Sequence, residues 1–266
     1  EPALEQLGRT AEKLVDEGYS FLVLSDRDMD EQRAPIPALL ATAAVHHHLV
    51  RVQKRHLTGL FVETAEAREV MHFATLIGYG ASAVNPWLAI ETIADLLATG
   101  KVDPSLTLET AVEHYVTAIR KGLLKVMSKM GISTIRSYKS AQIFEAVGLA
   151  DDFVGRWFPG TPSRIGGVGV REVARETLAR HAAAYRRSSE EREAVDSGGA
   201  IHYRRFSEGH RLGPEAVSAL QQAVRQGDGA AYRRFATLMN DEAKSRCTLR
   251  GLFGFAKRDP VPLDEV

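Results

Sequence analysis

Short apolar runs alternate with longer amphipathic stretches through the first 100 residues of the chain. Three of the runs are too short for a buried helix and favour buried strands: residues 19–24, 57–62 and 81–84. Apolar residues recur at helical spacing in four surrounding stretches: residues 4–15, 37–54, 65–77 and 87–98. Buried strands that alternate with helices predict parallel βα units, arranged in a barrel or in an open sheet.

The rest of the chain is predicted to be mostly helical. Thr107 begins a long helix that extends to Met130, because a threonine side chain can accept a hydrogen bond from the first turn. Further helices are expected at residues 140–146, 170–185, 212–224, 229–239 and 248–253, and short strands at 132–135 and 201–206. Glycine and proline predict a loop over residues 156–169, and residues 186–199 have the composition of a linker. The predicted fold class is α/β, a partial TIM-barrel-like set of parallel βα units followed by a mostly helical segment.

Polar side chains stand where each of the three predicted strands ends. Ser25-Asp26-Arg27 follow the first strand, Glu63-Thr64 the second and Asn85 the third. Ligands in parallel α/β folds bind beyond the carboxyl ends of the strands, so these residues are the first candidates for a site. The alternative is that they only mark where strands leave the core, since every strand must end in a loop.

Composition limits the classes of function. Lysine and arginine number 34, as do aspartate and glutamate, and this balance argues against a general nucleic-acid or membrane-surface binder. A lone cysteine, Cys247, cannot form an internal disulfide or hold an iron–sulfur cluster. With no long apolar run and no signal-peptide pattern, a cytoplasmic protein is expected. The chain begins at Glu1 and stops at Val266 without a closing element, which suggests a piece of a longer chain.

Three consecutive histidines, His46, His47 and His48, form the most visible cluster of possible metal ligands. Neighbouring positions on a helix point about 100° apart, so three in a row cannot converge on one metal ion. No HExxH or matching carboxylate pattern lies nearby. The histidines are therefore expected on a helix surface or at an interface, and no metal site is assigned.

Two further segments could hold an anion. Gly166–Gly169, with Arg164 close by, precedes a predicted helix and could present backbone N–H groups to a phosphate, but the recognised glycine-loop patterns are absent and a flexible loop is the alternative. Lys125, Lys129 and Arg136 flank Gly131 and could also attract an anion. The better explanation for the two lysines is that they complement the negative end of their own helix.

Several long strings resemble the central domain of glutamate synthase: residues 22–27, 33–40, 44–49, 62–69, 78–81, 84–86, 91–93, 125–134 and 142–149. The string Lys125-Val126-Met127-Ser128-Lys129-Met130-Gly131-Ile132-Ser133-Thr134 is the densest of them. Residues 220–225 and 248–253 resemble the lead-in to the FMN domain of the same family. The resemblance implies a central domain at 1–185, a linker at 186–200 and the start of the FMN-binding synthase domain at 201–266.

The resemblance also implies what the parent protein does. It makes L-glutamate from L-glutamine and 2-oxoglutarate, by ammonia channelling and reductive amination on FMN, with electrons delivered through an iron–sulfur cluster. Its expected partners are the other domains of the large subunit and either an NADPH-oxidising subunit or ferredoxin. The family's amidotransferase cysteine, main FMN-binding segments and cluster cysteines do not map onto this chain. No catalytic, cofactor-binding or metal residue is therefore carried over, and the piece is expected to be an inactive scaffold between two active sites.

Two other interpretations stay open from the residues alone. One is a small self-contained α/β enzyme that uses Asp26, Glu63 and Asn85. The other is a free-standing module that binds an anion or phosphate at Gly166–Gly169. Because a barrel needs more strands than this chain supplies, the scaffold interpretation also predicts an uncovered sheet edge, an uncovered apolar face, self-association and protease cleavage between Arg186 and Gly199.

Overall fold

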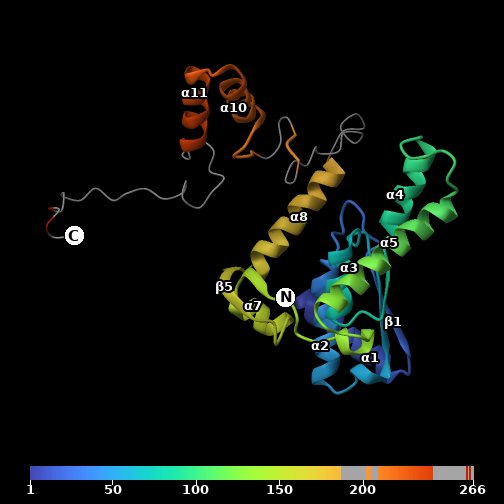
Figure 1. Ribbon diagram of the computed structural model, residues 1–266. Coiled ribbons are helices and arrows are strands. Elements are labelled where there is room, and N and C mark those ends of the chain that lie inside the picture. Colours follow the sequence, from blue (N-terminus) through green and yellow to red (C-terminus); the bar gives the residue numbers. More distant parts are fainter. Residues whose placement is uncertain (187–201, 205–208, 242–261, 263, 265–266) are drawn as a thin grey trace. The chain divides into compact units, whose positions relative to one another are not determined.

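The computed structural model describes residues 1–186, 202–204, 209–241, 262 and 264, and the chain divides into two compact units at residues 187 and 188 (Figure 1). Each unit is described by itself. The predicted linker at 186–199 and the predicted helix at 248–253 lie outside the described residues, apart from Arg186. Of the predicted strand at 201–206, residues 202–204 are described and form no strand.

A three-stranded parallel sheet forms the centre of the first unit. It contains β1 (Phe21–Ser25), β2 (Gly59–Glu63) and β3 (Ala83–Asn85), in the order β1-β2-β3. The helices around it are α1 (Pro2–Asp16), α2 (Ala38–Arg51), the 3₁₀ helix η1 (Arg55–Leu57), α3 (Val70–Gly78), α4 (Trp87–Ala98) and α5 (Leu108–Lys129). The sequence prediction of parallel βα units is confirmed.

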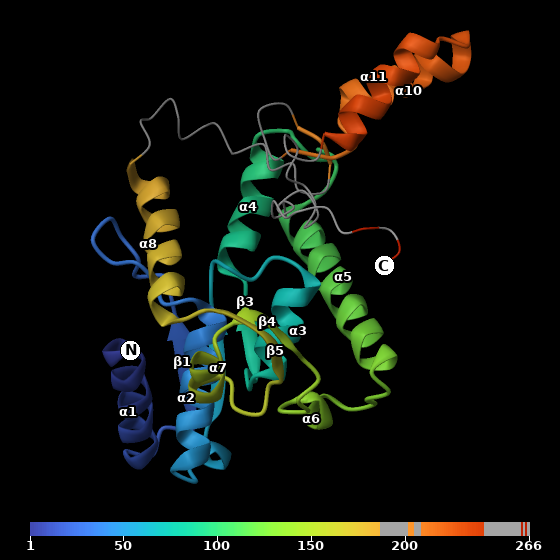
Figure 2. The ribbon, with the colours of Figure 1, turned by 90° about the vertical axis from the view of Figure 1, so that its left-hand side faces the viewer.

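Helices cover one face of this sheet. Leu22 and Leu60 pack against α1 and α2, in a cluster with Val15, Val45 and Leu49. On the β2 and β3 side, α3 and α5 supply a second cluster that is built from Val62, Phe73, Leu76 and Ile119, among others. Figure 2 shows α1 and α2 side by side next to β1, and α5 as a long helix on the β3 side. Leu22, Leu60 and Val62 point toward these helices, so the residues that alternate with them along the strands point to the other face of the sheet.

Helix α3 begins five residues later than predicted, at Val70 instead of Ala65. The side chain of Asp26 accepts hydrogen bonds from the Ala65 N–H, which holds this segment in a loop. A reciprocal capping box of Glu69 and His72 then starts the helix. The long helix α5 is capped as predicted, because the Thr107 hydroxyl accepts from the Thr110 N–H at 3.2 Å.

Residues 131–168 differ most from the prediction. A fourth strand at 132–135 is wrong, because Thr134 instead caps the short helix α6 (Ile135–Tyr138). A helix at 140–146 is also wrong, since Ser140 (φ 58°) and Gln142 (φ 54°) have left-handed backbones. The segment instead leads into β4 (Ala146–Leu149).

The predicted loop at 156–169 contains a strand. In the order β4, α7 (Asp151–Trp157), β5 (Ser163–Val168), the chain forms one more parallel βα unit, and α8 (Val170–Arg186) follows. A β-carbon at Gly167 would overlap the backbone of Gly148, so glycine permits the close approach of the two strands. Helix α7 packs through Phe153 and Trp157 onto α1 and α2.

The described part of the second unit is a helical hairpin. Helix α10 (Pro214–Gln226) ends at Gly227, whose φ of 65° suits a helix C-terminus. Asp228 then caps α11 (Gly229–Asn240) by accepting hydrogen bonds from the Ala230 and Ala231 N–H groups. The prediction of a mostly helical segment after the βα units is confirmed.

Candidate functional site

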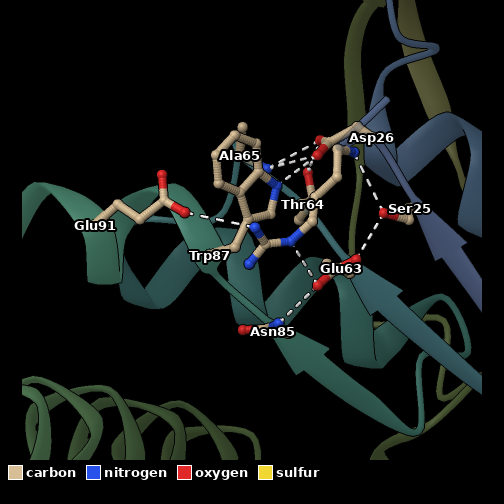
Figure 3. A network of polar contacts seen from close by, with 9 residues as sticks. Ser25, Asp26, Glu63, Thr64, Ala65, Asn85, Trp87 and Glu91 are labelled. Atoms are coloured by element: carbon tan, nitrogen blue, oxygen red, sulfur yellow. Dashed lines mark hydrogen bonds and ion pairs between the residues drawn. The ribbon is translucent and has the colours of Figure 1, made fainter. Parts of the chain in front are cut away.

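Asp26, Glu63 and Asn85, which the sequence places after the three strands, lie together at the carboxyl ends of the parallel strands. In the register of the sheet Ser25 is opposite Glu63, and Glu63 is opposite Asn85. Figure 3 shows Ser25, Glu63, Asn85 and Glu91 in one set of polar contacts, and Asp26, Thr64 and Trp87 in a second set directly beside it. The structure therefore brings Glu63 and Asn85 into contact and places Asp26 directly beside them.

Glu63 is the centre of one half of this network. Its carboxylate accepts from the Ser25 hydroxyl at 2.7 Å, from Nε of Arg27 at 2.8 Å and from the Asn85 amide at 3.0 Å. Hydrogen bonds from Ser25 first, and then from Arg27, lower the pKa of Glu63 below its ordinary value. The group is thus held as an anion, and each of its oxygens already accepts a hydrogen bond from the chain.

Asp26 is the centre of the other half. It accepts from the Thr64 hydroxyl at 2.6 Å, from the Ala65 N–H at 2.9 Å and from the indole N–H of Trp87 at 2.7 Å. The Thr64 hydroxyl in turn accepts from the Glu66 N–H at 3.1 Å. These bonds tie the end of β1 to the loop after β2 and to the helix after β3.

Arg27 connects the two halves. Its guanidinium lies 4.9 Å from the ring centroid of Trp87, a cation–π distance, and its NH1 is 3.4 Å from Glu91 on α4. The hydrogen bond with Glu63 raises the pKa of Arg27 above its ordinary value. Trp87 and Glu91 were not among the residues that the sequence singled out, whereas Ser25, Arg27 and Thr64 were. The sequence signal that could have identified Trp87 is its place two residues after Asn85, where the third strand ends.

A cavity of about 370 Å³ opens beside this network. Polar groups of Ser25, Asp26 and Glu63 line it, together with apolar side chains such as Leu7 and Ile36. The oxygens of both carboxylates accept hydrogen bonds from other groups of the chain. Neither carboxylate is therefore placed as a free general base toward the cavity. The arrangement is suited to fixing three strand ends and one helix relative to one another.

The three histidines have three different surroundings, as expected for adjacent helix positions. His46 is buried, so the expectation of a surface or interface position is wrong for this residue. His47 is half-buried, and its Nε2 is a buried atom without a partner among the described residues. His48 lies 2.8 Å from Glu12, which also binds Lys54 at 3.0 Å. Among the residues that the structure describes, no group of three or more possible metal ligands is found.

His46 is a structural contact between distant segments. Nε of Arg55 donates to its Nδ1 at 3.0 Å, which leaves the ring proton on Nε2, 3.1 Å from the Ser140 hydroxyl. The other Arg55 nitrogens donate to the carbonyls of Thr58 and Gly80 at 2.6 and 2.7 Å. Burial lowers the pKa of His46 to about 3, with further lowering by His47, Arg55 and Lys139. The ring is therefore neutral at ordinary pH.

The glycine segment is not an open anion cradle. Gly166 and Gly167 lie in β5, and the Gly169 N–H at the start of α8 donates to the Glu172 carboxylate at 3.0 Å. A carboxylate of the chain itself thus occupies the place that a phosphate would take. Arg164 lies 3.5 Å from Glu145 and is mostly exposed.

Lys125, Lys129 and Arg136 are all exposed. Lys129 lies in the last turn of α5, the position in which a cation complements the helix dipole, and Arg136 belongs to the short helix α6. Among the described helices, none is long and apolar enough to cross a membrane.

Parallel βα units with a polar network at the strand ends define an α/β domain. The family described as the glutamate synthase central domain matches residues 1–150. The chain belongs to this family.

Individual relatives match almost the whole chain. It is 41% identical over 267 residues to the glutamate synthase [NADH] of Schizosaccharomyces pombe, covering 99% of this chain and 13% of that protein. It is 41% identical to the glutamate synthase [NADPH] large chain of Bacillus subtilis, covering 100% of this chain and 17% of the relative. A ferredoxin-dependent glutamate synthase of Pyropia yezoensis is 38% identical, with 99% and 18% covered. The chain thus spans less than a fifth of the length of these relatives.

Proposed function

We propose that this chain is a non-catalytic scaffold segment of a glutamate synthase large subunit. The parent protein would make L-glutamate from L-glutamine and 2-oxoglutarate, by ammonia channelling and reductive amination on FMN. Relatives with this name match the chain almost from end to end, at 38 to 41% identity. In this proposal residues 1–185 are the later part of the central domain, 186–200 a linker and 201–266 the start of the FMN-binding synthase domain.

The observation that carries the scaffold role is that the strand-end carboxylates already accept hydrogen bonds from the chain itself. Asp26 and Glu63 stand where a parallel α/β enzyme would place its reacting groups. Each instead receives at least three hydrogen bonds from the chain itself. A network of this kind holds strand ends at fixed separations, which is what a spacer between two active sites requires.

Cofactors and redox partners belong to the parent in this proposal. An iron–sulfur cluster needs several thiolates, and this chain contains one cysteine, so its residues do not fit that group. FMN would be held by segments of the parent other than this one. The electron donor would be an NADPH-oxidising subunit or ferredoxin, since relatives with either name match. We place the parent in the cytoplasm, in line with the single cysteine of this chain, because disulfide-rich chains are typical of oxidising compartments.

A substitution in the parent protein separates a scaffold from a reacting group. Glu63→Gln should lower the thermal unfolding midpoint, because the charge-assisted bonds from Arg27 and Ser25 weaken. It should leave kcat for glutamate formation unchanged below that temperature. Asp95→Asn, on the exposed side of α4, is the matched control. A fall in kcat of about 100-fold or more in folded Glu63→Gln protein would instead identify Glu63 as a catalytic acid or base.

A further inference from the structure

One face of the three-stranded sheet is exposed, although parts of it are strongly apolar. The register places its residues in three rows: Phe21 with Gly59, then Val23 with Phe61 and Ala83, then Ser25 with Glu63 and Asn85. Phe21 is 65% exposed and Val23 is 60% exposed. The Phe21 and Phe61 rings lie 5.3 Å apart and form the middle of the apolar part. The third row is the polar network described above.

Helices cover the opposite face of the sheet. Leu22, Leu60 and Val62, which alternate with the exposed residues, are 6%, 0% and 2% exposed beneath α1, α2 and α3. Both connections between the strands, through α2 and through α3, therefore pass over the same face. A doubly wound open sheet would place helices on both faces. Connections that stay on one side are typical of a barrel wall, whose other face points inward.

We infer that the exposed face, defined by Phe21, Val23, Phe61 and Ala83, packs against further β-strands supplied by the same longer polypeptide. This inference rests on the proposed function, because it requires a parent protein. Parallel sheets are found almost only with both faces covered, so the face needs an occupant. Among the described residues, β1 and β3 each have one unpaired edge, to which such strands can hydrogen-bond.

Two observations favour this occupant over a second copy of the chain. The relatives are more than five times longer than the chain, so a segment tethered to it is available at high effective concentration. The rows also pass from apolar at the amino end to charged at the carboxyl end. Inward side chains of neighbouring barrel strands form layers across the same rows, so apolar groups would meet Val23 and polar groups would meet Glu63.

Thiol labelling measures whether the face is covered. Val23→Cys places a small thiol on it, and Met71→Cys, at a position that is 59% exposed on α3, is the matched control on the outer side. Each is made in residues 1–266 and in the parent polypeptide, and maleimide modification of the peptide that carries the new thiol is timed by mass spectrometry. In the 266-residue chain we expect the Val23→Cys thiol to react as quickly as the Met71→Cys thiol. In the parent, the Val23→Cys thiol should react about tenfold or more slowly, while the rate for Met71→Cys does not change.

Equal labelling rates for Val23→Cys in both proteins overturn the inference. The inference is also overturned if the Val23→Cys thiol of the 266-residue chain reacts slowly, and more slowly still as the protein concentration rises. A second copy of the chain then covers the face. Glutamate formation by the same parent sample separates this inference from the proposed function. An active parent with an open face contradicts the inference alone, and an inactive parent with a covered face contradicts only the proposed function.

Discussion

Asp26, at the end of the first strand, accepts a 2.7 Å hydrogen bond from the indole N–H of Trp87, the first residue of α4, 61 positions later. The same carboxylate binds the Thr64 hydroxyl and the Ala65 N–H after the second strand. One side chain thus fixes the exits of all three strands.

Replacing Asp26 tests this role. Asp26→Asn removes the charge and leaves one fewer acceptor for three donors, so the free energy of unfolding should fall by about 1–3 kcal/mol. Urea unfolding followed by tryptophan fluorescence measures the change. Asp28→Asn, two residues later and exposed, should change the free energy by no more than about 0.5 kcal/mol. Equal effects of the two substitutions would show that Asp26 is not the centre of the network.

The sequence was sufficient for the first sheet because its signals are local. Each of the three strands is an apolar run that ends in a polar residue. Because the strands are parallel, Glu63 and Asn85 lie side by side at the carboxyl ends of their strands. The sequence did not indicate which donors these carboxylates would bind. Asp26 binds Trp87 because of the way α4 packs, and Glu63 binds Arg27 because β1 and β2 pair side by side.

The second sheet could not be predicted because it depends on contacts between distant glycines. Gly148 and Gly167 looked like a helix stop and a loop residue, whereas they allow β4 and β5 to approach closely. The burial of His46 is likewise non-local. Helical spacing separates it from His47 and His48, but only the fold places Ser140, 94 residues later, against its ring.

The neutral state of the buried histidines predicts how stability depends on pH. The folded pKa of His46 is about 3 and that of His47 about 4, both below the ordinary 6.5, with burial as the main cause in each case. For each histidine, between its folded pKa and 6.5, the unfolded chain binds a proton that the folded chain does not bind. Stability should therefore fall as pH decreases below 6.5, by up to about 1.4 kcal/mol per pH unit for His46 and less for the more exposed His47.

Unfolding of the His46→Gln variant at pH 7 and pH 5 measures this contribution. Glutamine does not titrate, so the loss of stability between the two pH values should be smaller than in the original chain. His48→Gln is the matched control, because that ring lies beside Glu12 instead of a buried cation. An unchanged pH dependence in His46→Gln would show that His46 takes up its proton in the folded state.

Gly80 is predicted to tolerate no side chain. Its φ is 114°, and a β-carbon there would overlap the His46 ring that Arg55 holds in place. Gly80→Ala should therefore destabilise the chain by more than about 2 kcal/mol, from backbone strain and displaced packing together. Gly100→Ala is the control, since φ there is 65° and no atom lies within 4 Å. It should cost about 1 kcal/mol, and similar losses for both would refute the contact with His46.

Zinc should not stabilise the chain through its histidines. A metal that binds the folded state tightly raises the unfolding temperature by mass action. His46 and His48 already bind Arg55 and Glu12 on different sides of α2, so they cannot share an ion. Thermal unfolding with and without zinc should give the same midpoint. A large increase that disappears in a triple His→Ala variant would contradict this assignment.

The scaffold proposal is tested most directly by comparing glutamate formation by the parent polypeptide with that by residues 1–266 alone. Both are supplied with L-glutamine, 2-oxoglutarate and a reductant, and the flavin absorbance of each preparation is recorded. We expect glutamate formation and bound flavin in the parent, and a colourless, inactive 266-residue chain. Turnover or stoichiometric flavin in residues 1–266, or a folded parent that forms no glutamate, would contradict the proposal.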